Sequence, residues 1–206
     1  TGDYNTAVGY QSLYTNTNGS HNSAIGMYAL YSNTTGTTNV AVGESSLFTN
    51  TYGFGNSAMG YYALFSNTTG QYNNAIGYYA LYNNTTGTEN IAIGANALLS
   101  STIAQYNNAI GVNALRSTTT GASNSAVGYN AQYYNTTGVD NVSVGRASIR
   151  GATSGLCAPV GNSALGNYSL LSLSTGAYNV AIGQSALYSS TIGSNNISIG
   201  YNSMYN

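Results

Sequence analysis

The sequence predicts an all-β protein, a parallel β-solenoid of twelve 17-residue coils. A glycine that follows one small and one aliphatic residue recurs every 17 residues from Gly9 to Gly145 and again, after one step of 21, from Gly166 to Gly200. An asparagine stands four residues before each of these glycines. Seventeen residues are too few for the helix pairs of common helical repeats, which need about 33 to 47 residues, but they suit one turn of a β-solenoid.

The elements of each coil follow from its residue order. We number a coil from its asparagine, so that the second coil runs from Asn22 at position 1 to Thr38 at position 17. Positions 1 to 5, Asn-Ser-Ala-Ile-Gly in this coil, predict a short β-strand, and positions 8 to 11 predict a second one. Positions 12 to 15, Asn-Thr-Thr-Gly, predict the turn that closes the coil. The glycines of positions 5 and 15 predict a positive φ or a close backbone approach at two corners.

Side chains at the same position of successive coils stack into columns. Because side chains alternate between the two faces of a strand, we expect the aliphatic column of position 4 to fill the interior together with the leucine column of position 9. The asparagine column of position 1 is expected to hydrogen-bond to itself from coil to coil. The small residues of position 3 and the glycines of position 5 then form a smooth outward strip. We interpret this strip as the contact surface for another copy of the chain; the alternative is a monomer whose strip faces solvent.

The repeat covers residues 1–206, which predicts a single solenoid domain. The one longer step predicts a four-residue insertion around residues 156–161, in a loop that contains Leu156 and Cys157. Because residues 1–206 begin and end within a repeat, we expect them to be a fragment of a longer chain.

The composition excludes several classes of function. The chain has three arginines, no lysine and four acidic residues, for a formal net charge of −1, so it lacks the basic surface that binds nucleic acid. No apolar run approaches the roughly 20 residues that span a bilayer, so no membrane insertion is expected in this segment.

Residues that usually carry catalysis or bind metals are few and scattered. The single histidine, His21, and the single cysteine, Cys157, lie about eight coils apart, so one chain cannot bring them together as a base and a nucleophile. The four acidic residues show neither the pairing of a carboxylate dyad nor the clustering of a metal site. We therefore expect no catalytic residues, no metal and no cofactor, and a protein that is not an enzyme.

Tyrosine is the strongest candidate for binding. The 21 tyrosines fall mostly in columns at positions 6, 7, 10 and 17. Rows of tyrosine among asparagine, serine and threonine form a neutral surface that can stack on sugar rings and hydrogen-bond their hydroxyls. The alternative is that the stacked rings only stabilise the rod.

One group of charged residues interrupts this neutral surface. Arg116 and Arg150 occupy position 10 two coils apart, with Tyr133 between them, and Arg146 lies on the same coil as Arg150. We predict that these four residues bind a ligand, either an acidic sugar or a partner's carboxylate. The alternative is that they are solvated guanidinium groups without a ligand.

Two further patterns point to other functions. The threonine column of position 13 is compatible with an ice-binding face, although it lies in a turn. Asn-x-Thr sequences in the closing turn make Asn33, Asn67, Asn84 and Asn135 candidate glycosylation sites. The alternative is that these sequences are incidental to a composition rich in asparagine and threonine.

The repeat also resembles a known family. The segments Asn22–Gly26, Asn56–Gly60 and Asn124–Gly128 resemble the head repeat of trimeric autotransporter adhesins, to which repeats of bacteriophage tail fibres and bacterial surface filaments are related. The resemblance implies a left-handed parallel β-roll assembled as a homotrimer. It also implies an extracellular location, on a bacterial cell surface, a virion or a filament. The period of 17 is longer than is typical of adhesin heads, so adhesin, tail fibre and free filament remain open.

The function expected from these patterns is that of a non-enzymatic extracellular fibre segment, either an adhesin head or a tail fibre. Its tyrosine, asparagine and threonine columns are expected to bind cell-surface glycans or a receptor, and its partners are expected to be further copies of itself. The alternatives are a purely structural, self-assembling and glycosylated filament module, and an ice-binding solenoid.

Overall fold

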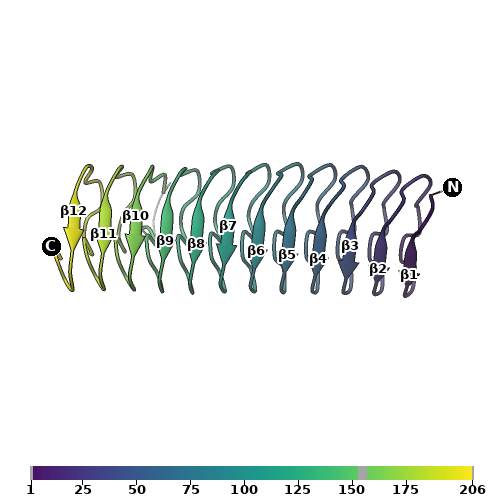
Figure 1. Cartoon of the computed structure of the whole chain (residues 1–206), viewed down its shortest axis with the longest axis horizontal. Coiled ribbons are helices and arrows are strands. Elements are labelled where there is room, and N and C mark those ends of the chain that lie inside the picture. Colours follow the sequence, from purple (N-terminus) through teal and green to yellow (C-terminus); the bar gives the residue numbers. More distant parts are fainter. Residues whose placement is uncertain (1, 153–156, 206) are drawn as a thin grey trace.

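The computed structural model describes residues 2–152 and 157–205, and these form a solenoid of short parallel strands arranged in single file (Figure 1). Each strand pairs with the next at an offset of 17 residues, except for one offset of 21, where Val142 pairs with Ser163. In this part of the chain no helix is long and apolar enough to cross a membrane. The strands are β1 (Thr6–Val8), β2 (Ser23–Ile25), β3 (Val40–Val42), β4 (Ser57–Met59), β5 (Asn74–Ile76), β6 (Ile91–Ile93), β7 (Asn108–Ile110), β8 (Ser125–Val127), β9 (Val142–Val144), β10 (Ser163–Leu165), β11 (Val180–Ile182) and β12 (Ile197–Ile199).

The predicted all-β parallel solenoid of twelve coils is confirmed, and each coil is named below by its strand. The strand occupies positions 2 to 4. The prediction of a second strand at positions 8 to 11 was wrong, because these residues form turns. In the β5 coil, Tyr79 at position 7 and Leu81 at position 9 have φ values of 54° and 52°, in the left-handed region that no strand residue adopts.

The interior differs from the one predicted. The leucine column of position 9 is buried as expected, and Leu81 has no exposed surface. Its neighbours inside are the alanines of positions 3 and 8, such as Ala75 and Ala80, which are also fully buried. The aliphatic residues of position 4 point outward, and 39% of Ile76 is exposed. Both the assignment of position 4 to the interior and that of position 3 to an outer contact strip were therefore wrong.

The asparagine column of position 1 explains which side of the strand faces inward. In the β5 coil, the backbone N–H of Asn73 donates to Oδ1 of Asn56 at 3.0 Å, and its side-chain Nδ2 donates to the carbonyl of Gly87 at 2.8 Å. This pattern repeats from coil to coil and confirms the predicted self-pairing column. Asn73 is completely buried. Because positions 1 and 3 lie on the same face of the strand, burial of the asparagine also turns the alanine inward.

A second buried asparagine ladder runs through position 12 of the closing turn. Nδ2 of Asn67 donates to Oδ1 of Asn50 at 2.8 Å, and Nδ2 of Asn84 donates to Oδ1 of Asn67 at 2.9 Å. The next coil has Ser101 at this position, and the ladder stops there. Oδ1 of Asn84 and Oγ of Ser101 are both buried without a hydrogen-bond partner. The same coil carries Ala104 where its neighbours carry glycine.

Restoring this ladder is expected to need two substitutions together. A Cβ built on Gly70, the equivalent of Ala104, would collide with Oδ1 of Asn67, so a position-12 asparagine requires a position-15 glycine. The double variant Ser101→Asn, Ala104→Gly is therefore expected to raise the free energy of unfolding by about 1 to 2 kcal/mol, since it pairs a buried acceptor. Ser101→Asn alone is expected to be neutral or destabilising. Denaturant unfolding of both variants checks this, and equal gains from both would contradict it.

The described part of the insertion pairs with the backbone of the neighbouring coils. Cys157 bridges Asn135, and Val160 bridges both Val139 and Ala177, in parallel. Leu156 lies outside the described residues. Cys157 is a free, buried cysteine, and its burial raises the pKa of the thiol.

Candidate functional site

The aromatic rings gather on the turn face of positions 6 to 11. The position-10 rings of the first five coils stack face to face, with centroid distances of 5.0 to 5.4 Å and interplanar angles of 3° to 12°. Parallel strands lie about 4.8 Å apart, close to the spacing at which aromatic rings stack, so each coil adds one ring to the row. The row comprises Tyr14, Tyr31, Phe48, Phe65 and Tyr82.

The rings are densest on the β4 and β5 coils, where positions 6 and 7 are aromatic as well. Tyr61 stacks on Tyr78 with centroids 5.4 Å apart, and Tyr62 stacks on Tyr79 with centroids 5.6 Å apart. On the β5 coil, Tyr79 and Tyr82 meet edge to face at 4.9 Å. Three adjacent rings per coil therefore form a continuous aromatic face.

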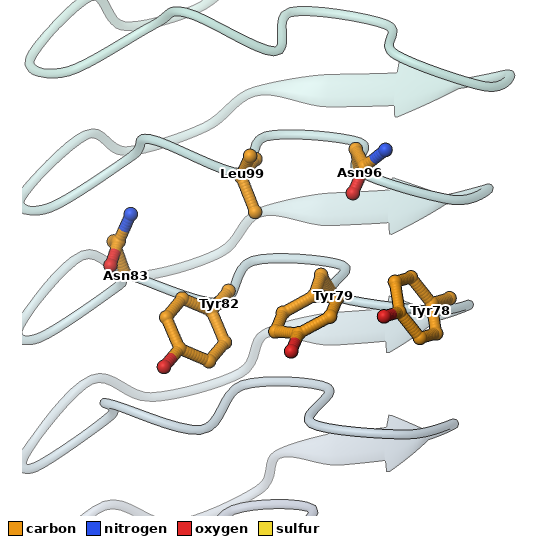
Figure 2. Close-up of a pocket in the computed structure, with 6 residues that line it drawn as sticks. All are labelled: Tyr78, Tyr79, Tyr82, Asn83, Asn96 and Leu99. Carbon is orange, nitrogen blue, oxygen red and sulfur yellow. The ribbon is translucent and has the colours of Figure 1, made fainter.

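A hollow opens where this aromatic face ends. On the β6 coil the three ring positions hold Ala95, Asn96 and Leu99, whose smaller side chains leave a hollow of about 400 Å³ beside the last rings. Figure 2 shows Tyr78, Tyr79 and Tyr82 along one coil, with Asn96 and Leu99 on the next. The hollow is lined by Tyr78, Tyr79, Tyr82, Asn83, Asn96 and Leu99.

The crowded rings hold their hydroxyls in the neutral form. Desolvation beside its neighbours, followed by a hydrogen bond with Tyr62, raises the pKa of Tyr61 to about 12. Desolvation and a hydrogen bond with Tyr78 also raise the pKa of Tyr79. The hydroxyls of Tyr61 and Tyr79 therefore stay uncharged throughout the neutral range of pH.

The raised pKa of Tyr61 predicts a loss of stability in alkali. A tyrosine whose pKa is higher in the folded than in the unfolded chain, where it is about 10, stabilises the fold fully below pH 10. That contribution is lost as the pH rises from about 10 towards 12. Tyr61→Phe is expected to remove the highest-pH step of the tyrosinate absorbance titration and to reduce the alkaline loss of stability. The same titration in denaturant is the control, and an unchanged high-pH step would contradict the assignment.

A second hollow, of about 250 Å³, lies three coils further along and contains predicted site residues. Nη1 of Arg116 donates to the hydroxyl of Tyr133 at 3.0 Å, and Tyr133 and Arg150 both line the hollow. The structure therefore brings Arg116, Tyr133 and Arg150 together. Arg146 is exposed and does not line the hollow. Its guanidinium lies 5.4 Å from the centroid of the Tyr168 ring and 5.9 Å from that of Tyr129, which does line the hollow. The complete lining is Asn113, Tyr129, Asn130, Tyr133, Tyr134 and Arg150.

A row of amides, which the sequence analysis missed, connects the two hollows. Asn96 in the first hollow donates from Nδ2 to Oδ1 of Asn113 in the second, at 3.3 Å. Asn113 donates in turn to Oδ1 of Asn130 at 3.1 Å. The signal available in the sequence was asparagine at position 7 of three successive coils, directly after Tyr79 in that column.

The four predicted glycosylation sites lie in the interior. Asn33, Asn67 and Asn84 have no exposed surface, and Asn135 is 1% exposed. Their side-chain amides are engaged in hydrogen bonds, including the position-12 ladder. The structure contradicts the expectation that these nitrogens are acceptors for sugar, because the folded coil does not present them at its surface.

The side-chain hydroxyls of the threonine column at position 13 donate hydrogen bonds to backbone carbonyls of the next coil. Oγ1 of Thr34 donates to the carbonyl of Thr51 at 3.0 Å, and Oγ1 of Thr85 donates to that of Thr102 at 3.0 Å. These hydroxyl protons point along the stack, so the column does not present them as a free array for ordering water.

The outer face of the strands forms a long apolar surface. Most aliphatic side chains of position 4 are exposed, with exposed fractions from 37% for Ile93 to 66% for Ile199. Position 2 adds Ile91 and Val142. Near the C-terminal end, aliphatic side chains from β9, β10 and β11 surround a shallow apolar hollow of about 210 Å³. We call this outer face, positions 2 and 4, the strand face.

Titratable groups are dispersed over the described residues. His21 stacks on the ring of Tyr4 with centroids 5.1 Å apart. Within residues 2–152 and 157–205, no three histidine, cysteine or acidic side chains lie close enough together to hold a metal ion.

Comparison with protein-family models, with curated proteins and with solved structures found no match to this chain. The function proposed below rests on the chain's own surfaces and on the resemblance of its repeat.

Proposed function

We propose that this chain is a non-enzymatic segment of an extracellular fibre that binds glycans on its aromatic face. The observation that carries the proposal is the hollow beside Tyr79 and Tyr82, which combines ring surfaces with the amides of Asn83 and Asn96. Ligand sites are typically concave, mostly apolar and equipped with a few well-placed polar groups. Sugar rings need this combination, since their C–H faces pack on aromatic rings while their hydroxyls form hydrogen bonds.

The repeat gives such a surface a multivalent character. Stacked rings extend over several coils on the N-terminal side of the hollow, so neighbouring sugar units have equivalent rings to contact. Weak contacts repeated along one rod, or over several copies of it, raise the overall avidity without any tight single site. This mode of binding suits a fibre displayed on a bacterial surface, a virion or a filament.

Glycan binding can be tested on an array and then by titration with any ligand found. Tyr79→Ala and Tyr82→Ala are each expected to weaken binding by about two- to tenfold, because aromatic contacts of this kind are worth ~0.5 to 1.5 kcal/mol. Tyr106→Ala is the matched control, since Tyr106 is an exposed tyrosine at position 17 that does not line the hollow. The absence of any bound glycan, or an equal loss in Tyr106→Ala, would contradict the proposal.

We further propose that the chain assembles as a homotrimer of left-handed coils through the strand face. Twelve coils at about 4.8 Å and three strand residues at about 3.3 Å make a strip of roughly 58 by 10 Å, or about 600 Å². Stable complexes bury about 800 Å² per partner, so this strip supplies most of the required area. Further copies of the chain fit it best, because they present aliphatic ridges at the same spacing. The side chains of Ile76 and Ile93 lie near its centre.

Assembly is tested by light scattering. The wild-type chain is expected to show three times the mass of one chain, and the double variant Ile76→Asp, Ile93→Asp the mass of a single folded chain. Asn74→Ser is the control, because it changes a neighbouring outward residue to one that other coils carry there, such as Ser57. A wild-type mass equal to one chain would contradict the trimer. A trimer that binds no glycan would favour a purely structural filament.

A further inference from the structure

The second hollow differs from the first in its charge, and this difference indicates which glycans the fibre selects. We propose that the groove formed by the two hollows binds a short acidic oligosaccharide, with one sugar ring on the aromatic hollow and the carboxylate of a uronic acid unit at Arg150. This inference rests on the proposed function and adds the class of its ligand. The groove is here defined as the two hollows and the amide row that connects them.

Arg150 supplies a positive charge without a counter-ion. Its Nε is buried and has no hydrogen-bond partner among the described residues. The guanidinium lies 6.0 Å from the centroid of the Tyr134 ring, and no described acidic side chain forms an ion pair with it. Buried polar groups are normally paired, and a guanidinium has five donors in a planar fork that matches a carboxylate. Arg150 as a whole is only partly buried and lines the hollow, so an anionic group entering the hollow can pair with the charge of its guanidinium.

Tyr133 provides a second donor in the same hollow. Its hydroxyl oxygen accepts the hydrogen bond from Nη1 of Arg116 at 3.0 Å. Because a phenol both accepts and donates, that contact leaves the hydroxyl proton of Tyr133 available to an acceptor in the hollow. A charge-assisted bond from Arg116 also polarises the hydroxyl, which strengthens it as a donor. Two donors of this kind, one of them cationic, favour a carboxylate over a neutral hydroxyl.

The amide row fixes the direction of the ligand. Asn96 lines the first hollow and Asn113 and Asn130 line the second, and the centres of the two hollows are about three coils or ~14 Å apart. A primary amide has two N–H groups and, on its oxygen, two lone pairs. Each hydrogen bond of the row uses one N–H group of one asparagine and one lone pair of the next. The remaining N–H groups and lone pairs can bind sugar hydroxyls. The ligand therefore runs along the solenoid axis, with its acidic end towards the C-terminus.

The test compares two probes of equal length, an oligogalacturonate and the same oligosaccharide after chemical reduction of its carboxyl groups. The wild-type chain is expected to bind the oligogalacturonate at least tenfold more tightly, and the difference is expected to shrink as salt is raised. Arg150→Gln is expected to weaken the acidic probe much more than the reduced probe and so to bring the two affinities close to each other. Tyr133→Phe, which keeps the ring, is expected to weaken only the binding of the acidic probe.

Arg146→Gln is the matched control for charge, because Arg146 lies on the same coil and carries the same charge but does not line the hollow. Its guanidinium reaches the hollow only through the ring of Tyr129, 5.9 Å away. If Arg146→Gln weakens the acidic probe as much as Arg150→Gln does, the effect is one of general charge and the assigned site is wrong. Equal binding of both probes by the wild-type chain would overturn the acidic specificity and leave the proposed glycan function standing. Binding of neither probe, with no other glycan bound on the array, would overturn both. Circular dichroism of each variant checks that the solenoid is intact.

Discussion

Replacing Gly77 with alanine is expected to destabilise the solenoid by about 3 kcal/mol or more. Gly77 stands at position 5 with a φ of +137°, a conformation that residues with a Cβ rarely adopt. A Cβ at this position would lie 2.7 Å from the backbone carbonyl carbon and oxygen of Gly94 in the next coil. Backbone cannot move aside as a side chain can, so the two coils would have to separate. The measurement is thermal unfolding by circular dichroism, with amide hydrogen exchange in the β5 and β6 coils.

The matched control for this variant is Gly193→Ala. Gly193 stands at position 15, its φ lies outside the left-handed region, and a Cβ there would meet only the side chains of Ser190 and Asn196. This substitution reproduces the serine and alanine pair that the chain already carries at Ser101 and Ala104. It is expected to change the free energy of unfolding by less than about 1 kcal/mol. Equal destabilisation by the two substitutions would show that the close approach at position 5 is not the cause.

Replacing Asn73 with leucine is expected to cost about 4 kcal/mol. Oδ1 of Asn73 accepts from both the backbone N–H and Nδ2 of Asn90, each at 3.0 Å, and its Nδ2 donates to the carbonyl of Gly87 at 2.8 Å. Leucine has a similar volume but none of these groups, so a buried N–H and a buried carbonyl lose their partners. Each such loss costs about 1 to 3 kcal/mol. Denaturant unfolding measures the change.

The control for Asn73→Leu lies one residue away. Asn74 occupies position 2 and points outward, and Asn74→Ser is expected to change the free energy of unfolding by less than about 0.5 kcal/mol. Asn73→Asp adds a second comparison, since it keeps the acceptor of Asn73 but loses the donor and places a charge in the interior. It is expected to destabilise strongly at neutral pH. A tolerated leucine at this position would contradict the structural role of the ladder.

The sequence predicted the parts of the candidate site in which the same residue type recurs at one position of successive coils. It did not predict the parts that depend on different residues at that position in adjacent coils. The stacked tyrosines of position 10 follow from the repeat, because equal positions must meet one strand spacing apart. The hollow beside Tyr82 arises only from the contrast in size between successive coils, where Leu99 follows a ring. Arg150 and Tyr133 were singled out in sequence, but their shared hollow needed the conformation of the turn that carries them.

Sequence alone determined the period, the number of coils, the parallel order of the strands and the self-pairing asparagine column. The physical reason is that a unit repeated at constant length can satisfy its backbone hydrogen bonds by pairing each strand with its own copy one coil later. The period, the number of coils and the parallel order do not depend on the direction in which a side chain points.

Only the tertiary structure decided which side of the strand is inside. Alternation leaves two choices, and the larger aliphatic residues of position 4 suggested the wrong one, because Ile76 lies outside and Ala75 inside. The outcome is set by groups remote from the strand: the left-handed backbone at Leu81 turns its side chain into a narrow interior, and the buried hydrogen bonds of Asn73 hold the strand in that orientation. Little room remains for side chains larger than alanine, so the isoleucines face outward and form the surface on which further copies are proposed to pack.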